Sequence, residues 1–149
     1  MIRNLNIYSE NRIKYNKSLI SEIIKRLKND LKFKIESIEL NFISSDKMVE
    51  INKKYLDHNF PTDIITFNYS DKNDSLDGEI FICRDVAKEN ASSFGCSTDD
   101  EILRLIIHGF LHLLGYNDIL DNEKREMKLK EDTYVNKYKG LLPGNSFTL

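Results

Sequence analysis

Apolar and polar residues alternate along this chain with two different periods, which distinguish its helices from its strands. Apolar side chains recur every three or four residues over 18–31, and this spacing predicts an amphipathic helix. Strict alternation over 38–42 predicts a half-buried strand, and short apolar runs at 5–8, 63–67 and 79–83 predict three more. The pattern therefore predicts about four strands.

Helix start signals organise the remaining segments. Asp46 is expected to cap a helix that runs to about residue 56, and Asp85 a helix that runs to about residue 94. Thr98 and Glu101 have the spacing of a capping box, which opens a long apolar helix. A final amphipathic helix is predicted at 121–138.

These elements do not alternate regularly along the chain, which favours an α+β fold. We predict a small mixed sheet of about four strands packed against about five helices. The length suits one domain, 1–149. Residues 71–77 read as a polar turn, and residues 139–149 as a loose tail.

Composition is that of a globular protein, with 40% hydrophobic and 31% charged residues, but the charge is divided unevenly. Residues 1–54 hold 12 Lys and Arg against 7 Asp and Glu, a net charge of +5, whereas residues 55–149 hold 10 against 17, or −7. The basic part is read either as a phosphate-binding surface or as a solvated helix face. This part contains Lys14, Lys17, Lys25, Arg26, Lys28, Lys32 and Lys34 among others.

The two cysteines and the apolar runs indicate the expected compartment. Cys83 and Cys96 do not form a CxxC pair, so we expect two buried thiols in a reducing cytoplasm. The first residues lack the apolar core of a secretory signal. The longest apolar stretch, 102–114, is too short and too polar for a bilayer span, so no membrane association is expected.

One short segment carries the candidate chemistry: His108-Gly-Phe-Leu-His112-Leu-Leu-Gly115-Tyr-Asn-Asp118. Histidines four residues apart on a helix share one face. Gly115 can take the left-handed conformation that ends a helix, and the reversed chain can bring Asp118 over both imidazoles. Three ligands on one side of an ion are typical of a catalytic zinc site, here at the C-terminal end of a buried helix.

The polar residues of this helix support a metal site. Glu101, Arg104, His108 and His112 follow one stripe of an otherwise apolar helix, and a buried polar stripe is costly unless its members are paired or bound to metal. The spacing resembles that of one metalloprotease group, in which a Glu follows the first His as general base. Gly109 occupies that position here, which disfavours a peptidase.

Residues 36–135 resemble the YbeY family of bacterial metal-dependent endoribonucleases. That family's motif, H-G-x-L-H-L-x-G-Y-D-H, corresponds to residues 108–118, and two further blocks appear in order as Pro61-Thr-Asp63-Ile-Ile-Thr-Phe67 and Gly78-Glu79-Ile80. The resemblance implies an α+β fold and one Zn²⁺, or another divalent metal, held by His108, His112 and Asp118. It implies hydrolysis of single-stranded RNA in 16S rRNA maturation and ribosome quality control, with rRNA and a ribosomal subunit as partners.

Two positions depart from the family pattern. Asp118 stands in place of the third histidine. Its carboxylate can still bind zinc, but it adds a negative charge. Leu56 replaces an arginine that the family links to catalysis, and the residues that could take over its role are Lys53, Lys54, Arg84 and Arg104. These departures keep a second hypothesis open, a ribosome-assembly binding protein with a structural metal. A minimal metallopeptidase is the third.

Three further residues have open roles. His58 is read as an exposed loop residue or as an acid–base group. Asp63 and Glu79 are read as groups that orient the ligands or act as bases, and Asp63 alternatively as the cap of a turn.

Overall fold

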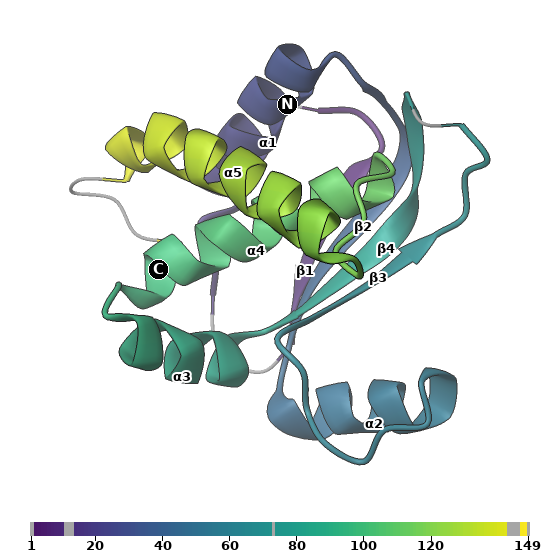
Figure 1. Cartoon of the computed structure of the whole chain (residues 1–149), viewed down its shortest axis with the longest axis vertical. Helices are drawn as coiled ribbons and strands as arrows, with labels where there is room; N and C mark the ends of the chain where they lie inside the picture. The colour runs from purple at the N-terminus through teal and green to yellow at the C-terminus, as the bar shows by residue number, and fades with distance from the viewer. Residues whose placement is uncertain (1, 11–13, 73, 143–146, 149) are drawn as a thin grey trace.

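Four strands form one mixed sheet, in the order β1 (Leu5–Ser9), β2 (Lys34–Ile43), β4 (Ser75–Cys83) and β3 (Ile64–Asn68) (Figure 1). The computed structural model describes residues 2–10, 14–72, 74–142 and 147–148. β2 pairs in parallel with β1 and with β4, whereas β3 runs antiparallel to β4 and forms an edge of the sheet. The predicted α+β fold is confirmed, although β2 and β4 begin earlier than their alternating patterns indicated.

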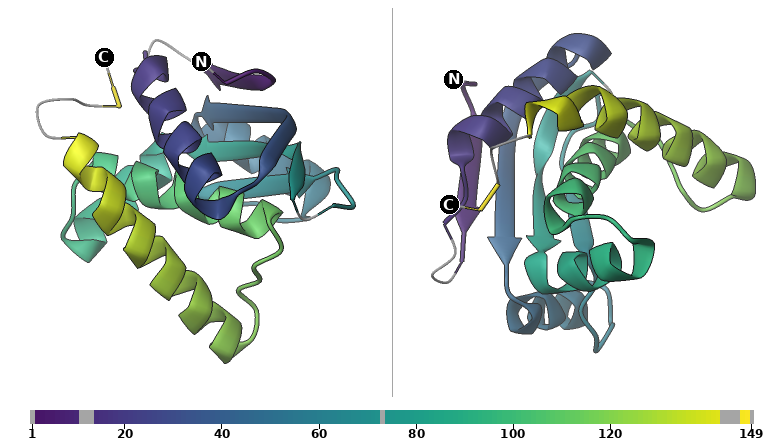
Figure 2. Two further views of the ribbon diagram at one scale, coloured as in Figure 1. Left: turned by 90° about the horizontal axis from the view of Figure 1, so that it is seen from above. Right: turned by 90° about the vertical axis from the view of Figure 1, so that its left-hand side faces the viewer.

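Five α-helices pack around this sheet within the described ranges. They are α1 (Lys17–Leu31), α2 (Ser45–Tyr55), α3 (Arg84–Phe94), α4 (Thr98–Leu113) and α5 (Asp121–Tyr138), and a short 3₁₀ turn, η1 (Lys139–Leu141), follows them. α4 lies along one face of the sheet, α5 crosses over α4, and α2 lies at the carboxyl ends of β2 and β4 (Figure 2). None of the described helices is long and apolar enough to cross a bilayer.

The main core lies between the sheet and α1 and α4. Alternate residues of β2 and β4, such as Leu40 and Ile80, are fully buried there against Ile106 and Phe110 of α4. Gly109 also faces the sheet, since a β-carbon at that position would lie 3.2 Å from side-chain atoms of Ile64 and Ile80. A glutamate at 109 would therefore point into the core, so a peptidase base has no place there.

A second, smaller core lies under α2 on the opposite face of the sheet. It contains Ile43, Met48, Ile51, Ile65 and Cys83. This arrangement confirms that Cys83 is buried, whereas Cys96 is exposed, contrary to the expectation that both thiols are buried. Cys96 follows Gly95, the C-cap of α3, in the short turn before α4.

The helix caps differ from three of the predictions. Ser44 and Ser97, not Asp46 and Thr98, accept the capping hydrogen bonds of α2 and α4. The carboxylate of Asp85 accepts from the backbone N–H and hydroxyl of Ser45 and so ties α3 to α2. The observed N-caps of α2, α3 and α4 are Ser44, Cys83 and Ser97, each one or two residues before the predicted residue. The position of a cap depends on where the preceding strand or turn ends.

The C-terminal segment is not a loose tail where the structure describes it. Phe147 is fully buried, and its carbonyl accepts a hydrogen bond from the backbone N–H of Asn16. Thr148 forms a β-bridge with Tyr15, whose ring stacks on Phe42 at 4.0 Å. Residues 143–146 and 149 of the predicted tail lie outside the described residues.

Candidate metal centre

The chain reverses sharply at the C-terminal end of α4. Gly115 has φ +104°, its N–H donates to the carbonyl of His112, and the N–H of Tyr116 donates to the carbonyl of Leu111. These two bonds define a Schellman motif, in which a glycine avoids the steric cost that a side chain meets at positive φ. The predicted helix end and chain reversal are therefore confirmed.

The reversal places Asp118 beside the first histidine. Asp118 Oδ2 lies 3.6 Å from His108 Nε2, and on the other side of the ring His108 Nδ1 lies 2.7 Å from Glu131 Oε2 of α5. Burial alone lowers the pKa of His108, but the hydrogen bond and charge of Glu131, with the charges of Asp118 and Asp63, raise it overall. An ionised carboxylate accepts hydrogen bonds, so Nδ1 carries the proton and Nε2 remains the donor atom for a metal.

The second histidine is oriented in the same way by the turn itself. His112 Nδ1 lies 2.9 Å from the carbonyl oxygen of Tyr116. A carbonyl can only accept, so His112 Nδ1 is protonated and Nε2 is again available. The two imidazole rings have centroids 6.0 Å apart. Tyr116 therefore packs beside the turn and fixes a histidine tautomer through its backbone.

This donor set fits a zinc ion chemically. Tetrahedral ligands about 2.0–2.2 Å from zinc lie roughly 3.3–3.6 Å from one another, as His108 Nε2 and Asp118 Oδ2 do, and each histidine has the outer hydrogen-bond partner typical of metal-binding imidazoles. Within the described ranges, however, no three His, Cys, Asp or Glu side chains already form a closed group around one point. The pairwise geometry is consistent with a metal, and the third donor, His112, lies one helical turn away.

The histidine groove, as we name the depression lined by Glu101, Arg104, His108, Asp118 and Glu131, has a volume of about 590 Å³. Glu101 is only 3% exposed, and its Oε1 has no hydrogen-bond partner among the described residues. Its pKa is raised by burial and by the charge of Asp63. The predicted capping role of Glu101 is thus wrong, because its side chain turns inward.

One more carboxyl group, that of Asp63, acts on the site through its charge. Asp63, just before β3, accepts a hydrogen bond of 3.1 Å from Asn90 of α3. Burial raises the pKa of Asp63, and its charge acts on His108. Asp63 is therefore part of the surroundings of the site. Glu79 is not, because it lies on the opposite face of the sheet and accepts a hydrogen bond from Tyr69.

Of the four residues that could replace the arginine missing at Leu56, Arg104 lines the histidine groove. Its guanidinium lies 2.8 Å from Asp132 and 3.3 Å from Glu131. Lys53 and Lys54 lie in the last turn of α2, and Arg84 begins α3 with its Nε buried and unpaired in the described structure. His58 stacks on Phe60 at 5.0 Å in the loop after α2.

Glu131 is the site residue that reasoning from the sequence missed. It is 9% exposed and lies on α5 between the buried residues Met127 and Val135, at a spacing of four residues from each. A carboxylate on the apolar stripe of an amphipathic helix is a signal that could have identified it.

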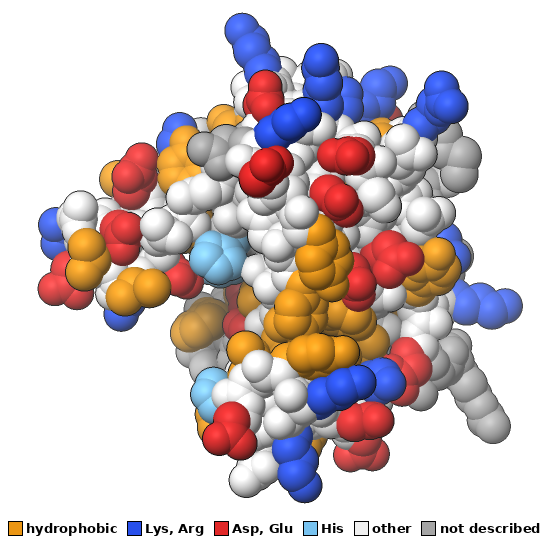
Figure 3. Space-filling view, turned by 90° about the vertical axis from the view of Figure 1, so that its right-hand side faces the viewer, with side chains coloured by type: hydrophobic (Ala, Val, Ile, Leu, Met, Phe, Trp, Pro, Cys, Tyr) orange, Lys and Arg blue, Asp and Glu red, His pale blue; other side chains and the backbone are white. Residues whose placement is uncertain are grey.

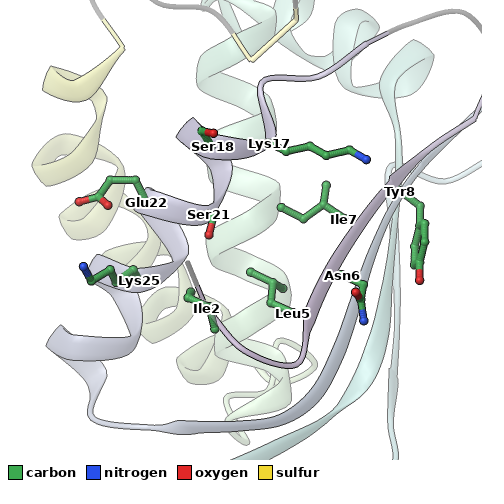
Figure 4. Close-up of a pocket in the computed structure, with 10 residues that line it drawn as sticks. All are labelled: Ile2, Leu5, Asn6, Ile7, Tyr8, Lys17, Ser18, Ser21, Glu22 and Lys25. Carbon is green, nitrogen blue, oxygen red and sulfur yellow. The ribbon is translucent and has the colours of Figure 1, made fainter.

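Another cavity of similar size, about 580 Å³, lies between β1 and α1 (Figure 4). Leu5 and Ile7 point from β1 toward α1 and make much of its wall apolar. Its one carboxylate, Glu22, is paired with Arg26 at 3.2 Å, and no histidine or cysteine lines it. The histidine groove, which contains His108, Asp118 and Glu131, is therefore the better candidate for the catalytic site.

Comparisons with known proteins match this chain to one family. The family model described as "Endoribonuclease YbeY" matches residues 3–139. A relative of that name from Chlorobium phaeobacteroides is 36% identical over 134 residues, covering 90% of this chain and 94% of the relative. Another from Bacteroides thetaiotaomicron is 41% identical over 112 residues, covering 75% and 81%.

A solved structure shares the fold as well as part of the sequence. The solution structure of TM1509 from Thermotoga maritima superimposes with a TM-score of 0.66 and is 29% identical, covering 94% of this chain and 92% of that one. The family match spans the helices that line the histidine groove. This chain belongs to the YbeY family of endoribonucleases.

Proposed function

We propose that this protein is a zinc-dependent endoribonuclease that hydrolyses single-stranded RNA, with rRNA, the 16S precursor above all, as its substrate on or near the ribosomal subunit. The family assignment supports an activity on RNA. The observation that supports a metal is the pair of imidazoles whose Nδ1 atoms are both engaged, which leaves the two Nε2 atoms as donors, that of His108 3.6 Å from Asp118 Oδ2.

In this proposal His108, His112 and Asp118 hold one zinc ion. A bound zinc ion polarises a phosphoryl oxygen and lowers the pKa of a coordinated water toward neutrality. The carboxylate ligand adds a negative charge that partly offsets this effect relative to three neutral imidazoles. The negative charges of Asp63, Glu101 and Glu131 around the site favour a cation there.

Other side chains of the groove have the chemistry to assist hydrolysis. The Arg104 guanidinium lies in the groove and can attract a phosphate, while its contacts with Glu131 and Asp132 hold it in place. Burial raises the pKa of Glu101 and of Asp63, and a higher pKa makes a carboxylate a better proton acceptor. We infer that either group could accept the proton of the attacking hydroxyl, as that oxygen bonds to phosphorus and the leaving oxygen departs.

Removal of the metal tests this proposal directly. Purified protein treated with a chelator and then dialysed is expected to lose cleavage of a fluorescently labelled single-stranded rRNA fragment, and one equivalent of Zn²⁺ is expected to restore it. Duplex RNA of the same sequence serves as the control for strand preference. Cleavage that persists at full rate without metal contradicts the zinc mechanism. Absence of cleavage with any divalent metal favours a binding role in ribosome assembly.

Replacement of Glu131 by glutamine is expected to weaken zinc binding by about 10- to 100-fold, the usual effect of losing the carboxylate partner of a metal-binding histidine. The amide keeps the shape of the side chain but withdraws the negative charge from His108 Nδ1. Isothermal titration calorimetry with Zn²⁺ measures the change. Glu126→Gln, on the exposed side of α5, is the matched control. Equal affinities for both variants contradict the role given to Glu131.

A further inference from the structure

A second groove, of about 480 Å³, lies on the outer face of the sheet, away from the main core. Four aromatic side chains line it, and we name it the aromatic groove: Tyr55 from α2, Phe67 and Tyr69 from β3 and its end, and Phe81 from β4. Figure 3 shows apolar side chains gathered on this side of the molecule, with histidine side chains on the same face. Tyr55 and Tyr69 are 57% and 59% exposed.

The rings of the groove are held in place but leave surface open. The ring of Tyr55 packs edge-on against Phe67 at 5.2 Å, and Phe67 packs edge-on against Phe81 at 6.0 Å. The hydroxyl of Tyr69 donates to Glu79 at 3.1 Å. Ordered, exposed aromatic rings are the feature on which unpaired bases stack, whatever their sequence.

Two lysines and two glutamates line the groove, and one of the lysines, Lys54, is placed to contact a phosphate. Its two carboxylates already have partners, because Glu79 accepts from Tyr69 and Glu50 pairs with Lys47 at 3.8 Å. Lys54 lies over the Tyr55 ring, 5.2 Å from its centroid, and forms no ion pair within the described ranges. Lys54 belongs to the basic N-terminal part of the chain, so a cationic group lies against the aromatic rings, where it can contact a phosphate of a stacked strand.

The groove is also close to the candidate catalytic groups, one strand away. Phe67 and Tyr69 face the aromatic groove, whereas Asn68 between them points to the other face and donates to the carbonyl of Leu113, the residue after His112. β3 is an edge strand, so a chain can pass around it without breaking the sheet. A single strand of RNA can thus reach the histidines while its neighbouring nucleotides lie in the aromatic groove.

We propose that the aromatic groove binds single-stranded RNA, whose bases stack on Tyr55 and Tyr69 while Lys54 contacts the phosphates, and so holds the substrate for the histidine groove. This inference rests on the proposed function, because it supplies a binding surface for the same RNA. It assigns the groove a contribution to affinity, with no contact to the reacting atoms.

The test separates binding from cleavage. Binding of a fluorescein-labelled oligouridine RNA is measured by anisotropy in the presence of a chelator, which prevents metal-dependent cleavage. The Tyr55→Ala and Tyr69→Ala variants are each expected to bind about tenfold more weakly, in the range found when a stacked base loses its aromatic partner. Tyr8→Ala is the matched control, since Tyr8 is 49% exposed on β1, the strand farthest from β3. Tyr55→Phe, which keeps the ring, is expected to recover most of the affinity.

Steady-state kinetics of RNA cleavage in the presence of Zn²⁺ provide the second measurement. The two alanine variants are expected to raise KM about tenfold with kcat nearly unchanged, because the lost contacts lie away from the reaction. Wild-type affinity in both variants, with cleavage intact, overturns this inference while leaving the proposed function standing. RNA binding that depends on Tyr55 and Tyr69 in a protein that never cleaves RNA supports the inference and contradicts the proposed function.

Discussion

Replacing His112 by alanine is expected to abolish stoichiometric zinc binding and to reduce RNA cleavage by more than about 100-fold. Loss of an outer hydrogen-bond partner of a metal ligand already costs about 10- to 100-fold, so the loss of a ligand itself should cost more. Only His108 and Asp118 then remain, and a water pKa near neutrality depends on a firmly held ion. Metal content of the purified protein and single-turnover cleavage measure the two effects.

His58→Ala is the matched control for this prediction. The chain has three histidines, and His58 stacks on Phe60 in the loop after α2. This variant is expected to keep one zinc per chain. Because His112 also hydrogen-bonds to Tyr116, thermal unfolding of the metal-free His112→Ala protein should accompany the assay, with an expected loss of about 1 kcal/mol. Zinc bound with unchanged stoichiometry and affinity by the His112→Ala protein contradicts the ligand assignment.

Replacing Gly78 by alanine is expected to destabilise the fold by about 3 kcal/mol or more, the largest effect on stability that we predict. A β-carbon at Gly78 would lie 2.3 Å from the backbone carbonyl oxygen of Phe67 and 3.2 Å from the side chain of Leu113. The obstructing atom belongs to the paired strand β3, so relief requires movement of the β3–β4 ladder or of the end of α4. For a chain of this size the loss corresponds to a fall in Tm of about 6–12 °C.

Gly140→Ala provides the comparison for the same chemical change without an obstruction. A β-carbon at Gly140 meets nothing within 4 Å, so its effect should stay within about 0.5 kcal/mol. Urea unfolding of both variants measures the difference. Equal stability of the two proteins contradicts the close approach of β3 and α4 to Gly78. Since the same approach positions the end of α4, Gly78→Ala is also expected to disturb the histidines.

Most of the candidate ligand set could be predicted from spacing alone, because its members are close in sequence. His108 and His112 share one helix face, and a single turn at Gly115 separates them from Asp118. Such relations depend on the geometry of one helix and its cap, which vary little between proteins. The position of Gly109 toward the sheet follows from the same helix geometry, one residue after His108.

Local sequence patterns could not predict the contacts between distant segments of the chain. The Glu131–His108 hydrogen bond joins residues 23 positions apart, and it exists because α5 crosses α4. The inward turn of Glu101 and the exposure of Cys96 also depend on which elements pack nearby. Periodicity identifies the buried side of a helix but not the neighbour that covers it.

By itself the sequence determined the α+β class, the strands and helices to within a few residues, the face shared by His108 and His112, and the turn at Gly115, since each depends on local backbone geometry. Only the tertiary structure decided that Glu131 orients His108, that Glu79 lies on the opposite face of the sheet, and that Tyr55 and Tyr69 line one groove. These relations come from packing between segments far apart in the chain, which local patterns do not specify.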